Sequence, residues 1–68
     1  MRYAVIFEKS ETTFGAYVPD LPGCIAVGES LAEAKTLIAQ AMKQHLAELK
    51  NEGHSAPEPM SVVAYIDA

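Results

Sequence analysis

The chain has 68 residues, half of them apolar, and nine acidic against five basic side chains give it a net charge of −4. This length fits one domain, and the acidic balance argues against binding a nucleic-acid backbone, which needs clustered Lys and Arg. One Cys and two His are too few for a disulfide framework or a structural metal site, and the opening apolar run is too short for a signal peptide or a membrane span.

The first half of the chain predicts three short strands joined by turns. Arg2–Lys9 and Thr13–Val18 are rich in β-branched and aromatic residues, and Cys24–Val27 is a shorter third segment. Gly15, inside the second segment, predicts a bulge or a close backbone approach. The first segment is partly apolar on both sides, which indicates that a second copy or a partner covers the other face of the sheet. The alternative is that Ala4 and Ile6 simply stay exposed.

The run PDLPGC, residues 19–24, predicts a tight connection between the second and third strands. Pro22 and Gly23 suit the two central positions of a type II turn, because Pro presets φ at the first and Gly accepts positive φ at the second. Asp20 is interpreted as a turn residue whose side chain accepts hydrogen bonds from nearby N–H groups.

Ser30 to Gly53 is the one long helical pattern. Ser30 and Glu33 form a capping box at its start, and Gly53 suits a left-handed residue that ends it. One side of the helix is apolar and must be covered by a sheet. That side consists of Leu31, Ala34, Leu37, Ile38, Ala41, Met42, His45 and Leu49.

Met60–Ile66 predicts a fourth strand, so the element order is β-β-β-α-β. The predicted class is α+β in two layers: a three-stranded antiparallel meander with one helix packed on one face. The helix would carry the chain across the sheet, which places the fourth strand parallel to the first as a right-handed crossover.

Three patterns in the sequence resemble a known family. PDLPGC at residues 19–24, GESLAEA at residues 28–34, and the late glycine and prolines at Gly53, Pro57 and Pro59 are similar to the first domain of HicB-type antitoxins of prokaryotic toxin–antitoxin pairs. The resemblance covers nearly the whole chain. It implies a partial ribonuclease-H-like fold, and a small basic HicA-type mRNA-cleaving toxin as the partner whose active surface is covered.

Two-domain members of that family carry a DNA-binding segment after this domain. The sequence stops at Ala68 without one, so we expect a single domain over residues 1–68 that does not bind nucleic acid directly. A core this small also favours a homo-oligomer, either a dimer or a tetramer. We expect a soluble, cytoplasmic protein.

The leading function is therefore neutralisation of a basic toxin by steric cover, without catalysis. The exposed acidic groups and one aromatic residue are the contact candidates. They are Glu8, Glu11, Tyr17, Asp20 and Glu29. A second set is assigned to structure, namely Pro19, Asp20, Leu21, Pro22, Gly23, Cys24, Ser30 and Glu33. The alternative is an orphan oligomeric ligand-binding or scaffold module without a toxin.

The sequence gives less support to an enzymatic function. A metal-dependent nuclease needs several convergent carboxylates, and no third acid joins Asp20 and Glu8 in the pattern. No His and acidic residue are spaced from Cys24 in a way that indicates a nucleophilic cysteine with a general base. Cys24 is therefore interpreted as a small buried apolar residue. His45 is either a pH-sensitive interface residue or a histidine at the core edge, and His54 lies in a loop. We expect no catalytic residue, no metal ligand and no cofactor.

Overall fold

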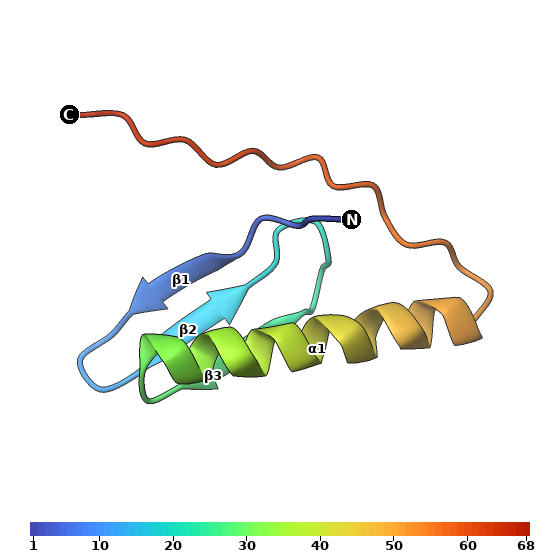
Figure 1. Cartoon of the computed structure of the whole chain (residues 1–68), viewed down its shortest axis with the longest axis horizontal. Coiled ribbons are helices and arrows are strands. Elements are labelled where there is room, and N and C mark those ends of the chain that lie inside the picture. Colours follow the sequence, from blue (N-terminus) through green and yellow to red (C-terminus); the bar gives the residue numbers. More distant parts are fainter.

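The computed structural model describes all 68 residues, with three strands followed by one helix (Figure 1). The strands β1 (Ile6–Lys9), β2 (Phe14–Tyr17) and β3 (Ile25–Gly28) form an antiparallel sheet in the order β1-β2-β3. The helix α1 (Leu31–Asn51) lies across one face of this sheet. The predicted α+β class and the antiparallel meander are confirmed. The helix does not combine the length and apolar character that crossing a membrane would require.

The first strand is shorter than predicted because its partner runs out. Ile6 lies opposite Tyr17, the last residue of β2. Residues before Ile6 would have to pair with the chain beyond Tyr17, where Pro19 has no N–H to donate. The chain before β1 nevertheless alternates as a strand does, since Tyr3, Val5 and Phe7 all pack against the core.

Both ends of α1 follow the sequence signals. The Ser30 side chain accepts a hydrogen bond from the Glu33 N–H at 3.0 Å, while the Glu33 carboxylate accepts from the Glu29 N–H at 2.8 Å, one residue earlier than a standard capping box. At the other end Gly53 has a φ of 80°. Its N–H donates to the Lys50 carbonyl, and the His54 N–H donates to the Leu49 carbonyl, which is the Schellman arrangement.

The close backbone approach lies at Gly28, not at Gly15. A Cβ on Gly28 would lie 2.7 Å from the Ala34 nitrogen, closer than real Cβ contacts allow. Gly15 pairs regularly with Glu8 and Val27, so the predicted bulge is wrong, and a Cβ there would meet nothing closer than 3.9 Å. Gly28 therefore lets the first turn of α1 sit directly on the end of β3.

The core is small and lies between α1, β2 and the loop that follows β2. Its buried members are Ala16, Val18, Leu21, Cys24, Ala34 and Ile38. The helix packs mainly on β3 and less on β2, whereas β1 has little or no contact with it. The inner side of β1 is consequently only half covered, with Tyr3, Val5 and Phe7 partly exposed.

The predicted fourth strand does not form. Residues 60–66, here called the tail, run in the same direction as β1 but pair with no strand (Figure 1). The base of the tail is held elsewhere: the Tyr3 hydroxyl donates to the Pro57 carbonyl at 2.6 Å, and Asp20 binds Met60 and Ser61. Beyond Ser61 the chain makes no backbone hydrogen bond to its own sheet.

Candidate functional site

The PDLPGC loop is built from two successive turns around one buried side chain. The Leu21 N–H donates to the Val18 carbonyl at 3.1 Å, and the Cys24 N–H donates to the Leu21 carbonyl at 3.0 Å. The second turn has Gly23 at a φ of 84°, which confirms the type II turn. Leu21, at the junction of the two turns, is fully buried. The motif thus folds the loop back so that one leucine closes this end of the core.

Asp20 binds the base of the tail instead of its own turn. Oδ2 accepts from the N–H groups of Met60 at 3.0 Å and Ser61 at 2.9 Å, and Oδ1 accepts from the Ser61 hydroxyl at 2.9 Å. The expected local turn bonds are therefore replaced by contacts some forty residues away. The Ser61 and Met60 backbone donors hold the pKa of Asp20 below its ordinary value of 3.8, because they stabilise the carboxylate.

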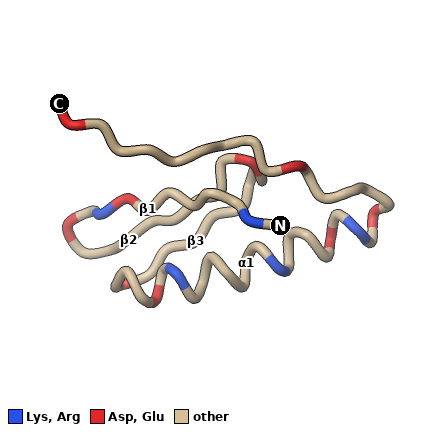
Figure 2. The backbone as a smooth tube through the Cα atoms, turned by 45° about the horizontal axis from the view of Figure 1, so that its top comes forward, with Lys and Arg blue, Asp and Glu red and all other residues tan.

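Three of the acidic candidates gather at one end of the sheet. Glu8 lies opposite Gly15 near the end of β1, Glu11 lies in the turn after it, and Glu29 directly follows Gly28, which pairs with Phe14. All three are exposed. Acidic segments accordingly mark the β1–β2 turn and the start of α1 at the left of the molecule (Figure 2). We call Glu8, Glu11 and Glu29 the acidic rim.

Tyr17 lies on the face of the sheet opposite to α1. Its neighbours across the strands are Ile6 and Ile25, and Val27 lies two residues further along β3 on the same face. Ile25 and Val27 are 68% and 61% exposed, which is unusual for β-branched residues in a strand. We call Ile6, Tyr17, Ile25 and Val27 the outer face.

The structure thus divides the five contact candidates. Glu8, on the same side of β1 as Ile6, brings the acidic rim to the border of the outer face, and Tyr17 lies within that face. Asp20 lies at the opposite end of the sheet and is engaged by the tail. Ile25 and Val27 were not singled out from the sequence. The signal was present, because both sides of the CIAV segment are apolar.

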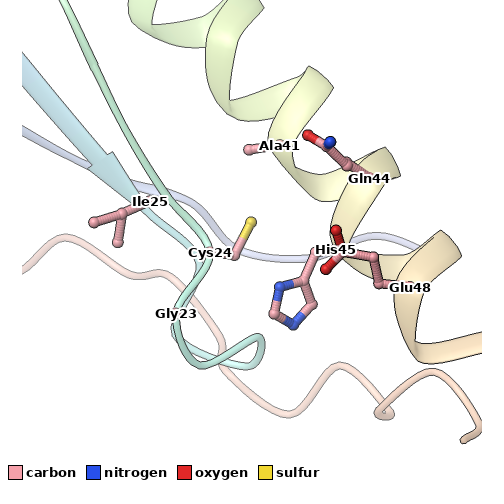
Figure 3. Close-up of a pocket in the computed structure, with 7 residues that line it drawn as sticks. All are labelled: Gly23, Cys24, Ile25, Ala41, Gln44, His45 and Glu48. Atoms are coloured by element: carbon pink, nitrogen blue, oxygen red, sulfur yellow. The ribbon is translucent and has the colours of Figure 1, made fainter. Parts of the chain in front are cut away.

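A shallow groove lies between the PDLPGC loop and α1 (Figure 3). It is lined by Gly23, Cys24, Ile25, Ala41, Gln44, His45 and Glu48. Its volume is about 180 Å³, below the roughly 300–1,000 Å³ of typical small-molecule sites. The groove therefore gives no support to a ligand-binding module.

The groove also lacks an activated nucleophile. Cys24 is buried, and burial raises the pKa of its thiol, which disfavours the reactive thiolate. His45 is half-buried on α1 and its ring extends toward the loop (Figure 3). No three His, Cys, Asp or Glu side chains of the chain come together as metal ligands. His54 lies in the exposed loop after α1.

Comparisons with known proteins agree with the motifs. The model of the family described as HicB_like antitoxin of bacterial toxin-antitoxin system matches residues 3–68. An "Uncharacterized 14.9 kDa protein in rep-hol intergenic region" of Haemophilus phage HP1 is 28% identical over 67 residues, which cover 98% of this chain and 50% of the phage protein. A "UPF0150 protein" of Helicobacter pylori is 38% identical over 45 residues, which cover 66% of this chain and 62% of that protein.

The matched regions span about half to three-fifths of the length of these two relatives. No solved structure matches the chain. The family model nevertheless covers all but the first two residues, including the PDLPGC loop, the Gly28–Ala34 contact and the tail. The chain belongs to the HicB-like antitoxin family of bacterial toxin–antitoxin systems.

Proposed function

We propose that this chain is an antitoxin that binds a small basic HicA-type mRNA-cleaving toxin and covers the toxin's active surface. The observation that carries the proposal is the family match over residues 3–68. The net charge of −4 supports it, because an acidic protein attracts a basic partner. We place the pair in the cytoplasm, where the mRNA substrate of such a toxin is found.

The outer face with its acidic rim is the surface that best fits such a partner. Protein interfaces combine an apolar centre with a polar border, and aromatic residues at the centre often contribute most of the binding energy. Tyr17, Ile25 and Val27 supply an exposed apolar centre. Glu8, Glu11 and Glu29 supply negative charge along one side. The proposed mechanism is steric, and it requires no catalytic group on this chain.

The first test is co-purification of the chain with the product of the adjacent open reading frame. A stable complex, sized by light scattering, is the expected result. A chain that does not associate with a basic product of that frame contradicts the proposed pairing.

The second test locates the interface. Val27→Lys and Tyr17→Ala should each weaken the complex, and a buried aromatic hot spot is worth about 2 kcal/mol or more. Ala39→Lys, which adds the same charge on the exposed side of α1, is the matched control. Equal effects of Val27→Lys and Ala39→Lys would mean that the partner does not dock on the outer face.

The acidic rim is tested by salt dependence. Replacing Glu8, Glu11 and Glu29 together by Lys should slow association by about tenfold or more at low salt, and the difference should shrink as salt screens the charges. Glu52→Lys, which reverses one charge at the far end of α1, is the control for a charge reversal away from the rim. An association rate that is insensitive to both charge reversal and salt would remove the rim from the interface.

A further inference from the structure

The tail is an exposed strand-forming segment that is apolar on both sides. Met60, Val62 and Ile66 alternate with Val63 and Tyr65. Val62, Tyr65 and Ile66 are at least 90% exposed. A strand with apolar residues on both sides is typical of a position covered on both faces. In the single chain Val62, Tyr65 and Ile66 are covered on neither face, and Val63 is only half covered.

The chain as a whole exposes more surface than a compact monomer. A folded monomer of 7.3 kDa is expected to expose about 4,200 Å², whereas this chain exposes 5373 Å². The radius of gyration is 13.0 Å, against about 11 Å for a compact chain of this length. The excess of roughly 1,200 Å² exceeds the roughly 800 Å² that each partner buries in a standard stable interface.

The unpaired edge of β1 is the place in the sheet where a strand like the tail could add. β1 is an edge strand with only β2 beside it, and α1 sits over β3 and β2 (Figure 1). The inner side chains Tyr3, Val5 and Phe7 are therefore only half covered. A strand added beside β1 would pair with its free backbone groups and cover these three residues.

The chain's own tail does not occupy this position. Asp20 and Tyr3 hold its base through Ser61, Met60 and Pro57, and the remainder runs along the molecule without a hydrogen bond to β1. We propose that the tail of a second copy adds to the β1 edge as a fourth strand, and that the two copies exchange tails reciprocally. Such an exchange is two-fold symmetric and closed, so it yields a dimer and not a fibre.

This exchange is independent of the proposed antitoxin function. It uses the β1 edge and the inner side of β1, which leaves Tyr17, Ile25 and Val27 free for another partner. It also accounts for the sequence pattern that predicted a fourth strand, because the strand would be completed between chains.

Light scattering on the full chain gives the first test. The expected mass is twice 7.3 kDa. The double variant Val62→Lys with Ile66→Lys should give the monomer mass while circular dichroism retains the α1 signal. Ala39→Lys with Ala47→Lys adds the same charge on exposed positions of α1 and should remain a dimer. A monomeric wild-type chain, or a tail variant that stays a dimer, overturns the proposal.

Isotope-filtered nuclear Overhauser measurements on wild-type protein decide between exchange and self-pairing, and they need no variant to fold. In an equal mixture of labelled and unlabelled chains, contacts between Val62 or Tyr65 and the β1 residues Ile6 or Phe7 should appear between chains. The same contacts found only within one chain would mean that each tail closes on its own sheet. A dimer whose tail contacts no β1 residue would place the interface elsewhere, and either result overturns the exchange.

Discussion

The backbone N–H of Ser61 donates a hydrogen bond to Oδ2 of Asp20 across 2.9 Å, and the Ser61 hydroxyl bonds the other carboxylate oxygen at the same distance. One side chain of the PDLPGC loop thus sets where the C-terminal segment leaves the body of the domain. The motif has two structural tasks: Leu21 closes the core, and Asp20 fixes the tail. Only the second task concerns the tail, whose base at Met60 and Ser61 is thereby held at the PDLPGC loop.

Replacing Asp20 by Asn should loosen the base of the tail. The amide has one acceptor oxygen instead of two and no charge, so the charge-assisted bonds to Met60 and Ser61 are weakened. Backbone relaxation measured by NMR should show increased motion at these two residues, with α1 unaffected. Asp67→Asn, which removes a carboxylate that makes no hydrogen bond in the structure, is the control. Unchanged relaxation at Met60 and Ser61 would contradict the role given to Asp20.

The same contact should respond to acid. The Ser61 and Met60 donors lower the pKa of Asp20, so the carboxylate binds protons more weakly in the folded chain than in the unfolded chain. Its contribution is therefore complete above the ordinary pKa of 3.8 and is lost as the pH falls through the lower folded value. Amide chemical shifts of Met60 and Ser61 should titrate with a midpoint below 3.8. A midpoint at or above that value would show that the bonds do not persist in solution.

A methyl group on Gly28 should destabilise the fold, because its Cβ would lie 2.7 Å from the Ala34 nitrogen. Gly28→Ala should cost about 1–3 kcal/mol of unfolding free energy, the range for overpacking. Gly15→Ala is the matched control in the neighbouring strand, where the nearest atom is 3.9 Å away, and it should change stability little. Urea denaturation measures both. Equal effects of the two substitutions would refute the close contact between β3 and α1.

The N-terminal cap of α1 is open to a similar comparison. Ser30→Ala removes the acceptor of the Glu33 N–H and should cost about 1 kcal/mol. Ser55→Ala, in the exposed loop after α1, removes a hydroxyl without a hydrogen-bond partner and should be neutral. Thermal melts that did not separate the two variants would mean that the helix start is held in another way.

Local sequence signals predicted the local structure well. Pro22-Gly23 specified its turn, and Ser30 and Gly53 marked the helix ends within one or two residues. Each of these features depends on a few residues that are neighbours in the sequence. A short stretch of sequence therefore contains all the information needed to predict it.

Relations between distant segments were harder to predict. Asp20 finds its donors in Met60 and Ser61, and no pattern in the PDLPGC loop reveals that choice. The composition of the tail is typical of a strand, but composition does not say which edge, or which copy, a strand joins. Likewise, Gly28 rather than Gly15 proved to be the close contact, because that distance depends on where α1 crosses β3.

The most direct test of the antitoxin account is an RNA-cleavage assay with the purified product of the adjacent open reading frame. Increasing amounts of this chain should suppress cleavage completely at a fixed stoichiometric ratio, and Val27→Lys should require more protein for the same effect. Cleavage that continues with excess chain present, or a neighbouring product that cleaves no RNA, would contradict the account.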